Sequence, residues 1–426
     1  MPPFDHPLRY ATVNELHARP FPSVDLPCTA VFLAIKEPTN AANRDREADL
    51  AHLTELTRRH GAPRPEPQAT HYSGHLGRAG LKWESHTEFV TYTAFSPGLS
   101  ARPFDPVEAT IFPADWIERA PGKRLVSALI RIAEMPEDPD DIFALCEDWF
   151  VPESMILSQV VDEAAIIAGD FRIDPAGHMR FAIFIRPGTS PRRIGRIVQR
   201  ICEIETYRAV SMLGLMRARH LNDRLNALDP QMEALVAGLE SDGRPSEAVL
   251  QDLLTISAEL EGLAVRFSFR FGATAAYEAI LNQRVQVLRE TRINGRQTIS
   301  EFMMRRYDPA MRTVKSAEKR LREMSERAAR AAELFRTRVD VERSGQNQRL
   351  LESMDHRADQ ALRLQHTVEG LSVVAISYYA VSLASYLGQP FGKAVGLSKE
   401  SLTAVLVLPV IGAVWLLIRR IRRKIH

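Results

Sequence analysis

Two long apolar runs near the C-terminus constrain the fold more than any other feature of the sequence. Residues 370–392 carry no charged side chain, and neither do residues 401–418. A helix rises about 1.5 Å per residue, so roughly 20 apolar residues cross the hydrocarbon core of a bilayer. Both runs are long enough, the second only just, and they predict a transmembrane hairpin that anchors a large soluble part. The alternative is that one run is a buried core helix, which suits the shorter run better.

A basic cluster follows the second run and predicts which side of the membrane holds the chain ends. It consists of Arg419, Arg420, Arg422, Arg423 and Lys424. Positive charge flanking a span stays on the cytoplasmic side, so we expect a cytoplasmic C-terminus and, after two spans, a cytoplasmic N-terminus. The first residues lack the basic and apolar regions of a signal peptide. The predicted location is therefore the cell inner (plasma) membrane, with the lipid bilayer as a partner.

The charge balance and the cysteines exclude some classes of function. The 55 Lys and Arg residues are matched by 53 Asp and Glu residues, so no strong field would attract a nucleic acid. Cys28, Cys146 and Cys202 are odd in number and far apart, and they form no zinc or CxxC spacing. We expect buried, reduced thiols in a cytosolic environment and no nucleic-acid partner.

The N-terminal part of the sequence mixes strand and helix patterns. Residues 28–35 form a continuous apolar, β-branched run that predicts a buried central strand. Further strands are expected at 69–77, 80–86, 87–95, 123–134, 155–162, 164–174 and 178–186. One helix is expected to start near Asn40 or Asn43 and another at Asp140 or Asp141. Several strands follow one another directly, so we predict an α+β or α/β cytosolic domain over residues 1–188, with a largely antiparallel sheet.

After residue 188 the strand pattern ends and helical periodicity takes over. A helix is expected from Pro191, a break at Pro230, Gly243 and Pro245, and further helices over 250–286 and 296–365, with kinks at Gly295 and Pro309. Apolar residues recur every seven positions at Val314, Leu321, Ala328 and Phe335, which is a coiled-coil signal. Residues 189–366 are therefore predicted to form a helical, coiled-coil-like stalk, and residues 367–426 the hairpin with its basic tail. The many charges of the stalk suit a solvated helical face.

One heptad seam continues from the predicted stalk into the first apolar run. Its positions are Leu351, Met354, Ala358, Ala361, Gln365, Val368, Ser372, Ala375, Tyr379, Ser382, Tyr386 and Gln389. Polar groups within a bilayer face protein or water, because lipid leaves them without hydrogen bonds. We therefore predict a homo-oligomer in which a pore is lined by Ser372, Tyr379, Ser382, Tyr386 and Gln389. The alternatives are that these residues join the two helices of one hairpin, that the tyrosines lie at the membrane interface, or that the apolar stripe packs on helices of its own chain.

A second set of polar residues suggests a site for a divalent cation. If residues 82–92 form one strand, Lys82, Glu84, His86 and Glu88 share one face of it. The Glu-x-His-x-Glu pattern would offer oxygen and nitrogen ligands to a metal ion, and His17 and Arg19 would join them if the N-terminal segment packs there. The alternative is an exposed edge strand that carries mixed charges for protection against aggregation.

Motifs of familiar enzyme classes are absent from the sequence. We find no P-loop, no GxGxxG, no GxSxG and no HExxH pattern. The expectation is therefore that the protein is not an enzyme and that no residue is catalytic.

Four segments together resemble a known family. They are HPLR at 6–9, NELHARPF at 14–21, KWESHTEFVTYT at 82–93 and TVEGLSVVAISYYA at 367–380. They resemble the bacterial family of uncharacterised membrane-anchored proteins that carry domain of unknown function 3422. The resemblance covers essentially the whole chain and implies a membrane-anchored protein, but it implies no activity and no catalytic residues.

The predicted architecture alone is similar to that of CorA-type divalent-cation channels. Those channels carry a Gly-Met-Asn signature at the end of the first span, where this chain has Gly388, Gln389 and Pro390. The predicted external loop also lacks the acidic residues expected to attract cations, with Glu400 as its only carboxylate. Two functional hypotheses follow: a CorA-like ion channel or transporter built by an oligomer, and a membrane-tethered binding or regulatory module without transport activity.

Overall fold

The chain is divided by its internal contacts into two compact units. In the computed structural model, unit 1 comprises Met1–Gly243 and Gln251–Ala331, and unit 2 comprises Arg244–Leu250 and Ala332–His426. The residues that the structure describes are 5–6, 8–10, 12–13, 21–39, 43–237, 244–394 and 398–425.

Unit 1 contains one mixed sheet. Its strands are β1 (Cys28–Lys36), β2 (His71–Leu76), β3 (Ala79–Ser85), β4 (Phe89–Pro97), β5 (Lys123–Glu134), β6 (Ile156–Val160), β7 (Ala165–Ile173), β8 (Met179–Ile185) and β9 (Thr291–Arg292). Their order is β2-β3-β4-β1-β5-β8-β7-β6-β9. Only β5 and β8 pair in parallel, and the other neighbours are antiparallel. The predicted α/β unit with a largely antiparallel sheet is confirmed.

The central strand β1 is buried along its whole length, as its apolar sequence predicts. Successive side chains of a strand point to opposite faces, so Val31 and Leu33 face one layer and Phe32 faces the other. Val31 and Leu33 belong to a core cluster that also contains Leu53 and Trp116. The helical elements before α5 are α2 (Arg46–Arg59), η2 (Pro106–Ile111), α3 (Ala114–Glu118) and α4 (Pro139–Trp149). All four contribute residues to that cluster or pack on it, so they cover the first face.

The N-caps of two helices differ from the prediction. Asp45 caps α2 through bonds from the backbone N–H groups of Glu47 and Ala48, so neither Asn40 nor Asn43 is the cap, and Asn40 lies outside the described residues. Asp138, rather than Asp140 or Asp141, caps α4. Near the start of each helix the sequence offers several Asn or Asp residues that could act as the cap. The cap is the one whose carboxylate accepts hydrogen bonds from the first free N–H groups of the helix.

The strands expected at 80–86 and 87–95 are confirmed as β3 and β4, whereas the single strand over residues 82–92 that the metal site assumed is wrong. β3 ends at Ser85 and β4 begins at Phe89, with Glu84 opposite Thr91 in an antiparallel pair. The backbone N–H of His86 donates to the Phe89 carbonyl at 2.9 Å and closes the turn. The turn contains neither Gly nor Pro, so its polar residues continued the alternation of the strand pattern. The edge-strand alternative is also wrong, because β3 lies between β2 and β4.

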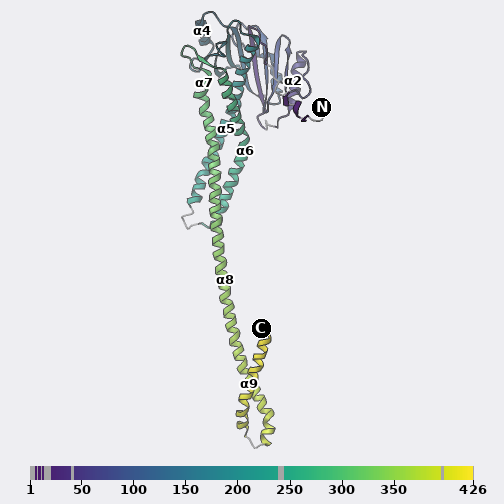
Figure 1. The fold of residues 1–426 in the computed structure, drawn as a ribbon, viewed down its shortest axis with the longest axis vertical. Helices are drawn as coiled ribbons and strands as arrows, with labels where there is room; N and C mark the ends of the chain where they lie inside the picture. Colours follow the sequence, from purple (N-terminus) through teal and green to yellow (C-terminus); the bar gives the residue numbers. More distant parts are fainter. Residues whose placement is uncertain are drawn as a thin grey trace. The chain divides into compact units, whose positions relative to one another are not determined.

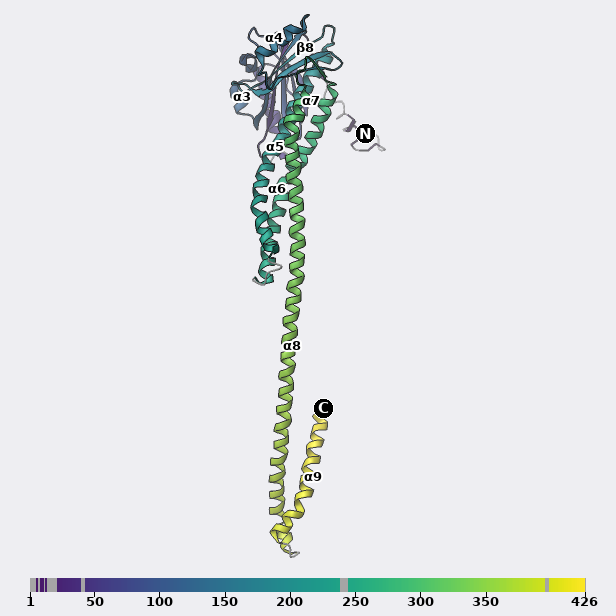
Figure 2. The ribbon, with the colours of Figure 1, turned by 90° about the vertical axis from the view of Figure 1, so that its left-hand side faces the viewer.

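Two long helices, α5 (Pro191–Ala237) and α6 (Ser246–Val287), lie side by side (Figures 1 and 2). They approach closely at Gly214, where a Cβ atom would come within 2.4 Å of Thr274 Oγ1 on α6. Pro230 lies inside α5 and does not end it, contrary to the prediction. The side chains of Leu228 and Met232 are buried on either side, and this packing maintains the helix across the missing hydrogen bond.

A nearly continuous helical segment follows β9. It consists of α7 (Ile299–Phe302), the π-helical turn η3 (Met303–Tyr307) and the 87-residue helix α8 (Asp308–Ala394). Within unit 1, Val314, Leu321 and Ala328 of the predicted heptad pattern are buried. Lys315 pairs with Glu278 of α6 at 2.8 Å, and Arg320 pairs with Asp229 of α5 at 3.1 Å. This part of the pattern is therefore an internal packing face rather than a coiled coil between chains.

In unit 2, α8 loses its partners soon after it leaves the start of α6. Ser246 donates to Glu342 Oε1 at 2.6 Å, and Arg343 pairs with Glu247 at 2.7 Å. From residue 340 to residue 368 every residue of α8 is exposed. Leu351 and Met354 on the predicted seam are 65% and 60% exposed, so the described part of the chain leaves this apolar stripe uncovered.

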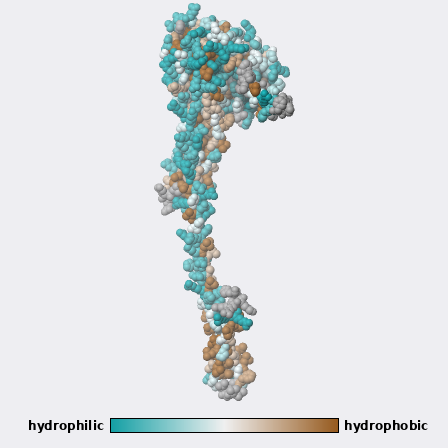
Figure 3. All heavy atoms as spheres, viewed as in Figure 1, coloured by the Kyte–Doolittle hydropathy of each residue, from teal (hydrophilic) through white to brown (hydrophobic). Residues whose placement is uncertain are grey.

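The end of α8 and the last helix, α9 (Lys399–Ile425), are long and apolar enough to cross a membrane. Figure 2 shows α9 turning back along the end of α8, and in Figure 3 hydrophobic residues gather on both segments. The two apolar C-terminal helices of the prediction are confirmed. Pro390 and Pro409 lie inside these helices, as membrane helices tolerate.

Candidate functional site

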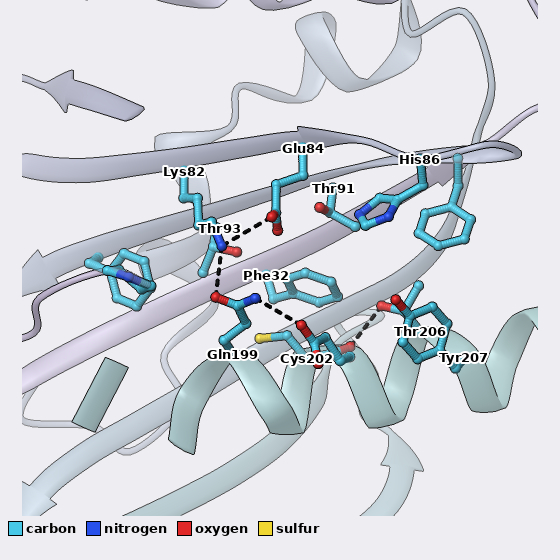
Figure 4. A pocket seen from close by; sticks show the side chains of 14 residues that line it. Phe32, Lys82, Glu84, His86, Thr91, Thr93, Gln199, Cys202, Thr206 and Tyr207 are labelled. Atoms are coloured by element: carbon cyan, nitrogen blue, oxygen red, sulfur yellow. Dashed lines mark hydrogen bonds and ion pairs between the residues drawn. The ribbon is translucent and has the colours of Figure 1, made fainter. Parts of the chain in front are cut away.

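A chain of buried and half-buried polar side chains joins the sheet to α5 (Figure 4). Lys82 Nζ on β3 lies 3.1 Å from Glu84 Oε1 and donates to Gln199 Oε1 on α5 at 2.7 Å. Gln199 in turn donates to Glu203 Oε1 at 2.8 Å, and Glu203 pairs with Arg284 of α6. The chain therefore runs from the sheet through α5 to α6, and each member satisfies its neighbour.

A small cavity lies against this polar chain. It is lined by Phe32, Lys82, Glu84, Gln199, Cys202, Thr206 and Tyr207, among others (Figure 4). The space open to the centres of water-sized molecules is about 20 Å³, which is enough for about one water molecule and not for an organic substrate. In this arrangement the polar chain links α5 and α6 to the sheet. The cavity beside the chain has no room for an organic substrate.

The residues predicted to bind a divalent cation are separated in the structure. Glu84 pairs with Lys82, His86 stacks on Phe89 with ring centroids 4.6 Å apart, and Glu88 points into a different set of charges. Across the described ranges, no group of three or more His, Cys, Asp or Glu residues could hold a metal ion. The proposed contributors His17 and Arg19 lie outside the described residues. Metal binding therefore stays a prediction that this geometry does not favour.

Glu88 instead forms the centre of a buried ion-pair triad. Its carboxylate lies 3.0 Å from Lys36 Nζ of β1 and also accepts a hydrogen bond from Arg270 of α6. Glu88 is 1% exposed. Burial alone would raise the pKa of Glu88, but Arg270 and Lys36 outweigh that effect and lower it. The triad therefore links strand, turn and helix through one ionised carboxylate.

The three cysteines are buried free thiols, as the sequence predicts. Burial raises the pKa of Cys28 and of Cys146 to about 12, and it raises that of Cys202 as well. The thiolate is the reactive form of cysteine, so these groups are inert at neutral pH.

A serine–histidine pair in unit 1 had no signal in the sequence. Ser127 Oγ of β5 and His178 Nδ1 lie 2.7 Å apart, and both residues are buried. Burial lowers the pKa of His178. The nearby Asp174 accepts the backbone N–H of His178 at 2.8 Å and so serves the turn between β7 and β8 rather than orienting the imidazole. Nucleophilic catalysis needs an accessible hydroxyl and an oriented base, and this buried pair is better understood as a packing contact.

The two apolar helices use a different face from the predicted seam. Ser377 of α8 is buried, and Gly388 approaches Leu402 and Leu406 of α9. At about 100° per residue, the face from Ser377 to Gly388 lies roughly opposite the seam that contains Tyr379 and Tyr386. The side chains of Ser372, Tyr379 and Tyr386 are accordingly exposed, while Ser382 and Gln389 are half-buried. The seam is thus not the contact that closes this hairpin.

These features define an α/β protein with long helices and two apolar C-terminal helices. A family model described as "Protein of unknown function (DUF3422)" matches residues 4–425. The chain therefore belongs to the DUF3422 family, and the resemblance carried by NELHARPF and the other three segments is confirmed. No curated protein matches the chain.

Proposed function

We propose that the protein is a membrane-anchored homo-oligomer of the inner membrane whose α8 seams meet along an axis and enclose an ion path. The observation that carries this proposal is the exposed seam of α8, which the residues that the structure describes do not cover anywhere between residues 340 and 368. Both chain ends lie in the cytoplasm in this proposal, because the basic cluster after α9 favours that side. The two-span topology and the location belong to the same proposal.

A second copy of α8 is the partner that suits the soluble part of the seam. Helices of this length derive most of their stability from packing of an apolar stripe, so a stripe that stays in water is costly. Anchoring by the same C-terminal helices would hold every copy parallel and at the same height above the membrane. Leu351 of one copy would then face Leu351 of the next, as the a positions of a parallel coiled coil do.

Within the membrane the same seam turns polar, which supports an ion path. Ser372 and Tyr379 continue the stripe of Leu351 on the face that α9 leaves open. Hydroxyl groups exposed to lipid lack hydrogen-bond partners beyond their own helix, whereas hydroxyl groups around an axis can bond to each other or to water. The Ser372 hydroxyl now donates to the Val368 carbonyl at 2.8 Å, which leaves its lone pairs available to a neighbour.

The first prediction concerns assembly. Leu351→Glu combined with Met354→Glu is expected to convert the detergent-extracted full chain from an oligomer into a monomer, because the seam would bury like charges. Light scattering coupled to size-exclusion chromatography measures the mass. A matched control adds the same two charges off the seam, with Ser353→Glu and Gln360→Glu, and should keep the oligomer. A monomeric wild-type chain at every concentration would refute self-association.

The second prediction concerns water access to the seam. Single cysteines placed at Ser372 or Ser382 are expected to react with small charged thiol reagents at least about tenfold faster than a cysteine at Val374, because only a hydrated thiol ionises readily. The native thiols are buried and give little background. Mass spectrometry of the labelled full chain in lipid vesicles measures the rates. Equal rates at all three positions would mean that no aqueous path follows the seam.

A tethered binding module is the second candidate, and the external loop favours it. Glu400 is the only carboxylate between the two apolar runs, so little would attract a cation to an entrance there. In that case the hairpin is an anchor alone, and exchanging it for an unrelated two-helix anchor would leave the properties of unit 1 unchanged. An oligomer with unreactive seam cysteines would favour this module over the channel.

A further inference from the structure

A cleft in unit 1 is lined by four arginines. Arg193, Arg196 and Arg200 come from the first three turns of α5, and Arg289 follows the end of α6. The remaining lining residues are Val161, Ile197, Gln286 and Val287. The cleft has a volume of about 640 Å³, within the usual range for a small-molecule site.

Among the described residues that line this cleft there is no carboxylate. Asp162 lies next to the cleft. It pairs with Arg289 at 2.5 Å and lies 3.8 Å from Arg193, so its one negative charge is shared by two of the four arginines. Glu203, the other nearby carboxylate, is engaged by Arg284 and Gln199. Among the residues that the structure describes, no carboxylate forms a salt bridge with Arg196 or Arg200. The cleft therefore holds an uncompensated positive charge.

Structural roles account for only part of the arginine hydrogen-bonding capacity. Arg193 donates to the Val161 carbonyl at 2.8 Å, and Arg200 makes a long bond of 3.5 Å to the Val287 carbonyl. The Arg196 guanidinium lies 5.9 Å from the ring centroid of Phe21. A guanidinium has five N–H donors in a planar fork, so Arg196 and Arg200 retain several donors for a ligand.

The cleft is also held in a defined shape. Val161, Asp162 and Glu163 have successive φ values of 52°, 53° and 62°, in the left-handed region that residues other than glycine rarely adopt. A bond of 2.7 Å from the Val161 N–H to the Leu288 carbonyl, together with the bond from Arg193, fixes this loop against the ends of α5 and α6. The strained loop places Asp162 within reach of both Arg289 and Arg193.

The neighbouring arginines repel the charge of Arg200. Burial lowers the pKa of Arg200, and the neighbouring charge of Arg196 lowers it further, with smaller contributions from Arg284 and Arg289, while Glu203 acts in the opposite direction. Like charges brought together at a partly buried site are costly, and an anion bound between them would remove that cost.

We propose that the arginine cleft formed by Arg193, Arg196, Arg200 and Arg289 binds a phosphate-bearing anion. Planar guanidinium groups bind phosphate oxygens in bidentate fashion, and several of them around one cavity suit a ligand with two or more negative charges. The volume of the cleft exceeds that of a single phosphate, so the ligand carries an organic part or a second phosphate. Its source is a soluble phosphate compound or the headgroup of an anionic lipid.

The test measures binding of defined probes to the full chain in uncharged detergent by isothermal titration calorimetry. The probes are pyrophosphate, for a soluble source, and dihexanoyl phosphatidic acid, for a lipid source, with dihexanoyl phosphatidylcholine to reveal binding of acyl chains alone. We expect pyrophosphate or phosphatidic acid to bind, with an affinity that falls as salt is added. Which of the two binds more tightly identifies the source.

The variant Arg196→Gln with Arg200→Gln should weaken binding of that probe by about tenfold or more, because charge-assisted hydrogen bonds are lost. Arg217→Gln with Arg219→Gln, which removes two exposed arginines elsewhere on α5, should bind like the wild type. Thermal unfolding of each variant checks that it is folded. Equal binding by the two double variants, binding of phosphatidylcholine as tight as that of phosphatidic acid, or no binding of any probe would overturn the proposal.

Discussion

Replacing Glu88 by alanine should destabilise the protein by about 3–5 kcal/mol, because the change leaves two buried cations without their common partner. Lys36 and Arg270 both contact the Glu88 carboxylate, and Glu88 is 1% exposed. Guanidinium chloride unfolding of the full chain in detergent, followed by far-ultraviolet circular dichroism, measures the change.

Two controls separate this explanation from metal binding. Glu84→Ala should cost less, about 1–3 kcal/mol, because Lys82 keeps its bond to Gln199. A chelator should leave the unfolding free energy of the wild type unchanged if Glu88 acts through its ion pairs alone. A chelator-induced loss that disappears in Glu88→Ala would instead revive the metal hypothesis.

The same triad predicts how acid affects stability. The pKa of Glu88 is lowered in the folded protein from its ordinary value of 4.5. A carboxyl group whose folded pKa is lowered stabilises the fold fully above its unfolded pKa, and this contribution is lost as the pH falls through the folded value. The difference in unfolding free energy between the wild type and Glu88→Ala should therefore be constant near neutral pH and shrink below about pH 4.5.

The sequence predicts those parts of the fold that depend on local periodicity. The buried run at residues 28–35 and the strand at 123–134 appear in the structure as β1 and β5, and the apolar runs appear as the ends of α8 and α9. The division between the strands expected at 80–86 and 87–95 agrees with β3 and β4. The metal hypothesis instead continued one strand through the turn at His86, which has no Gly or Pro, and so placed Glu84 and Glu88 on one strand face. A polar turn with the same alternation as its flanking strands gives no periodic signal.

Contacts between distant segments could not be predicted. Lys36 and Arg270 are far from Glu88 in the sequence, and no pattern in a single chain indicates that they meet. The arginine cleft could be predicted in part from the sequence. Arg193, Arg196 and Arg200 are spaced three and four residues apart and therefore share one face of a helix. Arg289 joins them only through the packing of α6 beside α5, which supplies the fourth charge and the far wall of the cleft.

The heptad seam shows that one sequence pattern can serve two kinds of contact. Val314, Leu321 and Ala328 repeat every seven residues and are buried within unit 1, yet Leu351 and Met354 continue a similar repeat in full exposure. Both regions have a similar apolar periodicity, but they differ in burial. The helices α5 and α6 cover the stripe at Val314, Leu321 and Ala328 and provide no partner for the stripe at Leu351 and Met354. Periodicity therefore indicates that an apolar stripe exists and does not reveal which chain covers it.

Replacing Trp116 by alanine should also destabilise the protein by about 3–5 kcal/mol, for a reason unrelated to charge. Trp116 of α3 is fully buried in the core cluster on the face of the sheet that α2 covers. Its ring stacks on His52 with centroids 3.9 Å apart, and its indole N–H donates to the His52 carbonyl at 2.9 Å. His52 in turn bonds Tyr92 of β4 through its Nδ1 atom at 3.1 Å, so the indole holds α2, α3 and the sheet together.

Two further variants separate the contributions of apolar packing and hydrogen bonding to the stability lost in Trp116→Ala. Trp116→Phe keeps much of the apolar contact but loses the bond from the indole N–H to the His52 carbonyl, so it should cost about 1–3 kcal/mol. Trp415→Ala, at a position of α9 that is 53% exposed, is a matched control that should change the unfolding free energy of unit 1 by less than about 0.5 kcal/mol. Denaturant unfolding of the full chain in detergent measures all three. A loss for Trp116→Ala no larger than that for Trp415→Ala would mean that the indole fills a site which can collapse, and that the stacked His52 and Tyr92 hold this face of the sheet without it.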